Sequence, residues 1–181
     1  MKILNLTQIK EALKGLDIIP AIEDGFVQYS QGNVVVPPVG ELIFEDPPGD
    51  VHIKYGYIKN DDVYVIKLAS GFFKNAELGL PSSQGMMLAF SQKTGQPVAV
   101  LHDEGHMTNI RTAAAGAVVA KHLAPSNVLS IGIVGTGTQA RLQLEYLDGI
   151  VDCKDIMVWG RNEDHAAQYC EDMQTQGFSV K

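Results

Sequence analysis

Val128 to Ala140 read VLSIGIVGTGTQA, a β-branched run that leads into a glycine turn and then a helix-forming pattern. A strand, a tight turn and a helix in this order are typical of the unit that binds the pyrophosphate of a dinucleotide. Gly135 is expected to let the chain turn sharply, and Gly137 to let backbone N–H groups approach phosphate oxygens. A glycine turn with a purely structural role is the alternative. The predicted cofactor-binding residues here are Gly135, Thr136, Gly137, Thr138, Gln139 and Ala140.

Composition limits the classes of protein to consider. The chain has 181 residues and a net charge of −7, which argues against non-specific nucleic-acid binding and against a polybasic membrane patch. The longest apolar run, residues 113–120, is too short to span a bilayer. Cys153 and Cys170 are the only cysteines and form no metal-type pair, so we expect a reducing, cytoplasmic location.

The first part of the chain predicts an α+β domain over residues 1–124. Two short helices are expected, one capped by Thr7 and one over residues 20–30, followed by an extended segment at 34–39. Strand patterns then follow with short turns between them, which predicts an antiparallel or mixed sheet. The predicted strands are Glu41–Phe44, Val51–Ile58, Val63–Ala69, Gly85–Ser91 and Gln96–His102.

Residues 125–181 predict the first part of a Rossmann domain. An alanine-rich helix over residues 108–123 precedes the glycine-turn strand, and Asp155–Trp159 predicts a second strand. A helix over 164–176 and the start of a third strand at 177–180 follow. Because a doubly wound domain needs about five or six strands, the chain is expected to be a truncated α/β protein.

The tip of the second strand indicates the choice of cofactor. An acidic residue there would accept a hydrogen bond from the ribose of NAD, but Gly160, Arg161 and Asn162 supply none. Arg161 is suited to a bidentate contact with a 2′-phosphate, so NADP is favoured over NAD. The alternative is that Arg161 is a solvated loop residue.

Several polar residues upstream are candidates for contact with the substrate or the cofactor. Lys67 lies between apolar residues of a predicted strand, so it either faces a pocket or points outward on an edge strand. His52 and Lys54, on another predicted strand, share one face because side chains alternate along a strand. Arg111 falls in the first turn of the alanine-rich helix, where the dipole disfavours a cation, so a nearby substrate carboxylate would explain it. Thr112 is placed to donate its hydroxyl to a phosphate. A surface arginine is the alternative.

No metal is expected. His102 and His106 are four residues apart, but the intervening Asp103-Glu104-Gly105 is typical of a turn, and the sequence follows neither zinc-protease order.

These residues together resemble the ornithine cyclodeaminase/mu-crystallin family. The resemblance is carried by the RTAAA motif at 111–115, the glycine turn at 135–140, Lys67, the LPSSQG motif at 80–85 and the Thr94-Gly95 turn. It implies an N-terminal substrate and dimerisation domain, a Rossmann domain after it, a homodimer and a longer chain, with a catalytic aspartate beyond residue 181.

The resemblance also implies roles for single residues. Lys67 and Arg111 match the catalytic and carboxylate-binding positions, His52 matches a substrate-binding position, and Thr112 matches a threonine near the cofactor phosphates. Cyclodeaminases have a glutamate near His52 that holds the side-chain amine of ornithine, and many relatives have an arginine at Val39. Ornithine itself is therefore in doubt as the substrate.

We expect an NAD(P)-dependent enzyme that acts on an amino acid or its imine, by cyclodeamination or by oxidoreduction. The alternative is an NADP(H) or small-ligand binding protein of the mu-crystallin type. Residues 1–181 alone are expected to be inactive, with no nucleic-acid or membrane partner.

Overall fold

The computed structural model describes all residues, 1–181, and divides them into two compact units. The first contains Met1–Asp17 and Asp24–Thr108, and the second contains Ile18–Glu23 and Asn109–Lys181. Two helices, α2 (Ile19–Ser30) and α3 (His106–Leu123), carry residues of both units. The functional division predicted between residues 124 and 125 stays a prediction.

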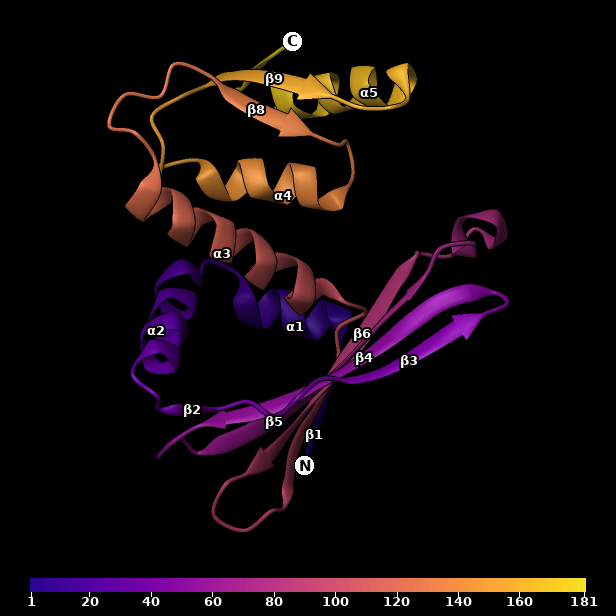
Figure 1. The fold of residues 1–181 in the computed structure, drawn as a ribbon, viewed down its shortest axis with the longest axis vertical. Helices are drawn as coiled ribbons and strands as arrows, with labels where there is room; N and C mark the ends of the chain where they lie inside the picture. The colour runs from indigo at the N-terminus through magenta and orange to yellow at the C-terminus, as the bar shows by residue number, and fades with distance from the viewer. The chain divides into compact units, whose positions relative to one another are not determined.

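The first unit is built on a seven-stranded mixed sheet (Figure 1). The strands run in the order β1-β7-β6-β5-β4-β2, with β3 paired to β4, and only the β1–β7 pair is parallel. This confirms the predicted α+β layout with a mixed sheet. The strands are β1 (Lys2–Asn5), β2 (Val34–Val35), β3 (Gly40–Glu45), β4 (Pro48–Ile58), β5 (Val63–Phe72), β6 (Ser83–Ser91) and β7 (Pro97–His102).

The N-terminal segment differs from the prediction. Residues 2–5 form a strand, and Asn5 rather than Thr7 caps α1 (Leu6–Leu13) through a reciprocal capping box with Gln8. The strand was missed because its partner, β7, lies more than ninety residues away along the chain. The turn between β3 and β4 is also shorter than predicted, since Pro48 to Asp50 belong to β4. A short 3₁₀ helix, η1 (Asn75–Leu78), follows β5.

The second unit carries a three-stranded parallel sheet in the order β10-β9-β8. Its elements alternate as β8 (Ile131–Val134), α4 (Thr138–Leu147), β9 (Asp155–Trp159), α5 (Glu163–Gln174) and β10 (Ser179–Val180). The predicted second strand matches β9 in both bounds. From the sequence, the helix after the glycine turn is expected over residues 141–147, and α4 begins three residues earlier. Alternating strands and helices around a parallel sheet confirm the predicted α/β class.

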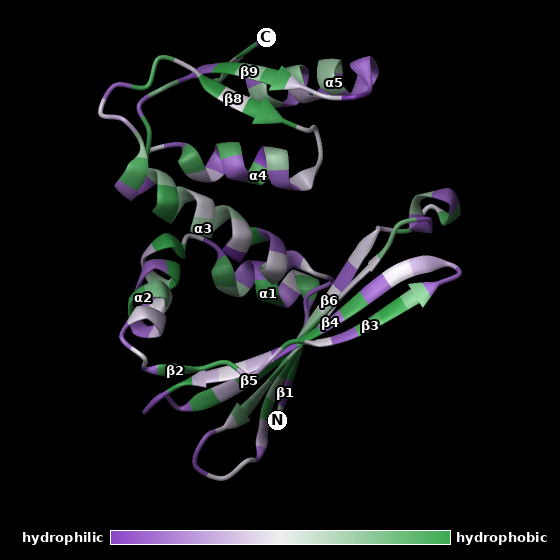
Figure 2. Cartoon of the chain, viewed as in Figure 1, coloured by the Kyte–Doolittle hydropathy of each residue, from purple (hydrophilic) through white to green (hydrophobic).

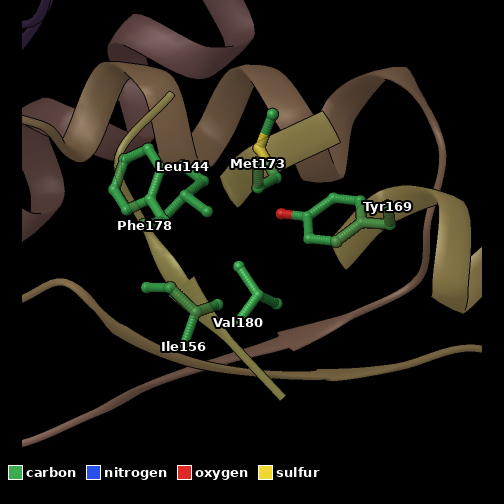
Figure 3. Packing of buried hydrophobic residues seen from close by; sticks show 6 residues of the cluster. All are labelled: Leu144, Ile156, Tyr169, Met173, Phe178 and Val180. Atoms are coloured by element: carbon green, nitrogen blue, oxygen red, sulfur yellow. The ribbon is translucent and has the colours of Figure 1, made fainter. Parts of the chain in front are cut away.

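One apolar cluster holds this second unit together (Figure 3). Its buried members come from both helices and from two strands, so α4 and α5 cover the same face of the sheet. β8 and β9 themselves carry mainly apolar residues (Figure 2). The cluster consists of Leu144, Ile156, Tyr169, Met173, Phe178 and Val180. No helix in the structure combines the length and the apolar character needed to cross a membrane.

Candidate functional site

The glycine turn joins β8 to α4 and is fixed to the end of β9. Gly135 has a φ of +108°, a backbone conformation that disfavours a side chain, and its N–H donates to the Trp159 carbonyl at 2.7 Å. Gly137 is the N-cap residue of α4, and no side chain caps the helix there. The first N–H groups of α4 therefore keep their hydrogen-bonding capacity and their positive dipole end for an anion.

A cavity of about 590 Å³ brings this turn together with the tip of β9. The sequence analysis assigned these two segments to one cofactor site, although Gly135 and Gly160 are 25 positions apart. In the structure, both segments line the same cavity. The lining residues are Val134, Gly135, Thr136, Gly137, Trp159, Gly160, Arg161, Asn162 and His165. The chain's one tryptophan, Trp159, is therefore an internal fluorescent probe of whatever binds here.

Close packing within the cavity wall requires a glycine at position 160. A Cβ at Gly160 would lie 2.7 Å from the Thr136 Cγ2, a distance that the short threonine side chain cannot relieve without moving the turn. By contrast, no protein atom lies within 4 Å of the Cβ position at Gly137, so that glycine leaves open space in front of α4.

We expect Gly160→Ala to weaken binding of the predicted dinucleotide about tenfold, because it displaces Thr136 and the turn. Quenching of Trp159 fluorescence measures the affinity. The matched control is the double variant Gly160→Ala with Thr136→Ser, which removes the clashing methyl group and should restore binding. A single variant that binds as tightly as the wild type would show that the contact at 2.7 Å has no consequence for the turn.

Arg141 ties the glycine turn to α5. Its guanidinium donates to the Thr136 carbonyl, bonds the Asp172 carboxylate at 2.6 Å and lies 5.0 Å from the centre of the Tyr169 ring. The Arg141 hydrogen bond lowers the pKa of Asp172. Tyr169 in turn donates its hydroxyl to the Ala140 carbonyl at 3.0 Å. Sequence reasoning gave Arg141 no role, because its partner lies 31 residues further along the chain.

Several predicted cofactor residues lie outside the cavity lining. The Gln139 amide donates to the Asn109 carbonyl at 3.1 Å, so its side chain binds α3. The Thr112 carbonyl accepts from the Gln143 amide at 3.2 Å, and the Thr112 side chain is half-buried. Thr138 and Ala140 form the first turn of α4. The roles predicted for these residues stay predictions.

At the tip of β9, the side chains of Asn162 and Arg161, both predicted to bind the cofactor, differ in whether they have a structural partner. The Asn162 side chain accepts the His165 N–H at 2.9 Å and so caps α5, whereas Arg161 is exposed on the cavity wall. Asn162 thus has a structural task whether or not it touches a ligand.

Lys67 and His52 lie on one face of the first unit's sheet. Register pairs Lys67 with Lys54 on β4 and with Met87 on β6, and it pairs His52 with Ala69, two residues from Lys67. Directly opposed residues and residues two apart share a face, so His52 and Lys54 share a face as predicted, and register adds Lys67 to it. Lys67 is half-buried in the middle of β5, whereas Lys54 is exposed.

Two carboxylates that the sequence analysis missed flank His52. Its Nε2 lies 3.0 Å from Glu41 Oε1, and its Nδ1 lies 3.6 Å from Asp50 Oδ1. Register pairs Glu41 with His52 across the β3–β4 hairpin. The alternation of side chains along both strands of that hairpin was the sequence signal from which Glu41 could have been predicted. The two carboxylates therefore place negative charge beside His52, close to where the resemblance implies a glutamate.

Arg111 is exposed on α3, and this helix begins next to the buried side chain of Asp103. Asp103 is 1% exposed, and its Oδ2 accepts the Met107 N–H at 2.8 Å, which caps the start of α3. His106 lies in the same turn. Burial lowers the pKa of its imidazole, Lys10 lowers it further, and the Asp103 carboxylate opposes both effects.

This pKa shift predicts a pH-dependent stability. The unfolded chain takes up a proton at His106 near pH 6.5, whereas the folded chain resists it, so the free energy of unfolding should fall as pH drops below about 6.5. His106→Gln should make urea unfolding less dependent on pH across that window. Parallel pH profiles for the variant and the wild type would contradict this assignment.

All residues from 1 to 181 match the ornithine cyclodeaminase/mu-crystallin family. The chain belongs to this family. It is 38% identical over 178 residues to an uncharacterised cyclodeaminase of Sinorhizobium fredii, a match that covers 97% of this chain and 54% of that protein. It is 35% identical over 178 residues to the alanine dehydrogenase of Archaeoglobus fulgidus, covering 95% of this chain and 53% of that protein. The chain thus spans about half the length of these relatives.

Solved structures of the family share its fold. The Delta(1)-pyrroline-2-carboxylate reductase of Thermococcus litoralis, in complex with NADH and L-proline, matches with a TM-score of 0.88 and 27% identity. An archaeal alanine dehydrogenase dimer with bound NAD matches with a TM-score of 0.90 and 29% identity. Both matches cover 100% of this chain, and 56% and 55% of those chains. Relatives in the family are therefore oxidoreductases and cyclodeaminases.

Proposed function

We propose that the protein binds NAD(P) at the glycine turn and uses it to oxidise or reduce an amino acid or its imine. The observation that supports this most directly is the cavity that joins residues 134–137 to the tip of β9, beside the uncapped N-terminus of α4. Phosphate oxygens fit such a helix end because it offers unpaired N–H groups and a positive dipole. The solved relatives bound to NADH and NAD support the same ligand class.

The bound nicotinamide would supply or accept the hydride at the substrate's α-carbon. Arg111 has the guanidinium that a substrate carboxylate needs for a bidentate contact. Lys67 would hold or transfer a proton at the reacting nitrogen, since a half-buried ammonium in a sheet is partly desolvated. His52, with Glu41 beside it, would contact the substrate side chain.

Cyclodeamination and simple oxidoreduction predict different products. The full-length protein incubated with NAD⁺ and ornithine should release ammonia if it is a cyclodeaminase. Consumption of NADPH with a cyclic ketimine, without ammonia release from ornithine, would identify a reductase instead. Tight cofactor binding without turnover of either substrate would favour the binding-protein alternative. Because the relatives are about twice as long, we expect residues 1–181 alone to bind but not to turn over, and measurable turnover would refute this.

We further propose that NADP is preferred over NAD. The residues that line the cavity include Arg161 and no carboxylate, although the solved relatives named above hold NADH and NAD. Arg161→Ala should weaken NADP binding about tenfold and leave NAD binding nearly unchanged. Equal losses for both cofactors would assign Arg161 to a part of the ligand that they share.

We propose a homodimer formed through the first unit. Register places five exposed apolar side chains on one face of its sheet, spread from the edge strand β1 to β3: Ile3, Leu42, Phe44, Tyr55 and Tyr57. A large exposed apolar surface of this kind is typical of a protein interface. Sedimentation velocity should give a dimer, and Tyr55→Asp should shift it toward monomer. A cytoplasmic location remains an expectation, consistent with two free cysteines.

A further inference from the structure

His165 lines the same cavity as Arg161, although nothing in the sequence motif points to it. It lies four residues after Arg161, in the first turn of α5. The Asn162 side chain accepts the His165 backbone N–H at 2.9 Å, which fixes that turn against the tip of β9. His165 and Arg161 therefore both contribute to the wall of one cavity.

We propose that His165 is a specificity-determining residue of the cofactor site, whose protonated imidazole binds the same 2′-phosphate as Arg161. This inference rests on the proposed preference for NADP. Arg161 carries its charge at every physiological pH, whereas a histidine binds a phosphate as a cation only after it has taken up a proton. The protein's preference for NADP over NAD thus depends on pH.

The charged groups around His165 are few. The turn from Val134 to Gly137 brings no charge to the cavity, and the tip of β9 brings only Arg161. The helix itself brings Glu163 and Asp164 in the same first turn, and neither lines the cavity. These two carboxylates oppose a phosphate, so Arg161 and protonated His165 act together against them.

The experiment compares NADP and NAD affinities by calorimetry at about pH 6 and about pH 8, because histidine side chains change charge within the physiological range. Calorimetry is chosen because an imidazolium can quench the nearby Trp159. The wild type is compared with His165→Gln, Arg161→Ala and Glu163→Gln. The 2′-phosphate itself titrates near pH 6, so the measured quantity is the difference between wild type and His165→Gln at each pH.

At about pH 6 we expect His165→Gln to lower the ratio of NADP to NAD affinity about fivefold, and at about pH 8 to leave it nearly unchanged. Glu163→Gln should raise NADP affinity at both pH values and keep the pH dependence of the wild type. Equal losses for NADP and NAD in His165→Gln would overturn the proposal and indicate contact with adenine. A ratio unchanged at both pH values would overturn it as well.

The outcome also separates this inference from the one on which it rests. If Arg161→Ala lowers NADP affinity selectively while His165→Gln does not, only the role of His165 is wrong. If Arg161→Ala leaves the ratio unchanged, the preference for NADP is itself wrong, and the role of His165 falls with it.

Discussion

Replacing Lys67 by methionine should lower kcat by about a hundredfold or more without unfolding the sheet. Methionine keeps the length and apolar stem of lysine but has no ammonium to hold or transfer a proton. Lys67 lies at the middle of β5, whose neighbours β4 and β6 pair with it on both sides, so the backbone position is well supported. Because residues 1–181 alone are expected not to turn over, steady-state kinetics of the full-length protein on whichever substrate it converts would measure the loss. Thermal unfolding would show that the fold persists.

The matched control is Lys54→Met. Lys54 lies directly opposite Lys67 on the adjacent strand and shares its face, but it is exposed. This variant removes the same charge from the same surface, so it separates a general electrostatic effect from a specific role of Lys67. If both variants lose kcat equally, or if Lys67→Met keeps it, the alternative of an outward-facing strand lysine is correct.

Local pattern was sufficient to predict most of the first unit's sheet. Alternation and short turns located β3 to β7, because each of these strands pairs with a neighbour in sequence. β1 was not predicted because a segment of four residues is too short to show a distinctive hydrophobic period. Only its pairing with the distant strand β7 makes it a strand. Glu41 was missed for a related reason, because its candidate role depends on its contact with His52 on the neighbouring strand.

The cofactor site, like the sheet, was predicted from the sequence only in part. The turn requires glycines, which form a recognisable local motif, and Gly135 has the positive φ that this motif predicts. Arg141 and His165 belong to no such motif, because a single arginine or histidine within a helical segment forms no distinctive sequence pattern. Their contacts depend on how α4 and α5 pack against the sheet, which only the three-dimensional structure supplies.

That dependence predicts that a core substitution outside the cavity lining will affect cofactor binding. Tyr169→Ala should lower the free energy of unfolding by about 3–5 kcal/mol, because Tyr169 is 0% exposed and packs among Ile156, Met173 and the other cluster residues (Figure 3). The substitution also removes the ring over which Arg141 lies. Arg141 then holds the Thr136 carbonyl less firmly, so dinucleotide affinity should fall along with stability.

Tyr169→Phe separates these two effects. It keeps the ring for Arg141 and the core but removes the hydroxyl that donates to Ala140, which should cost about 1 kcal/mol and leave cofactor affinity unchanged. Burial raises the pKa of Tyr169 to about 12, so the unfolded chain loses this proton first as the pH rises past 10. The wild type should therefore lose stability above pH 10 more steeply than Tyr169→Phe. Urea unfolding of both proteins tests this, and a Tyr169→Ala variant as stable as the wild type would mean that the ring does not anchor α5.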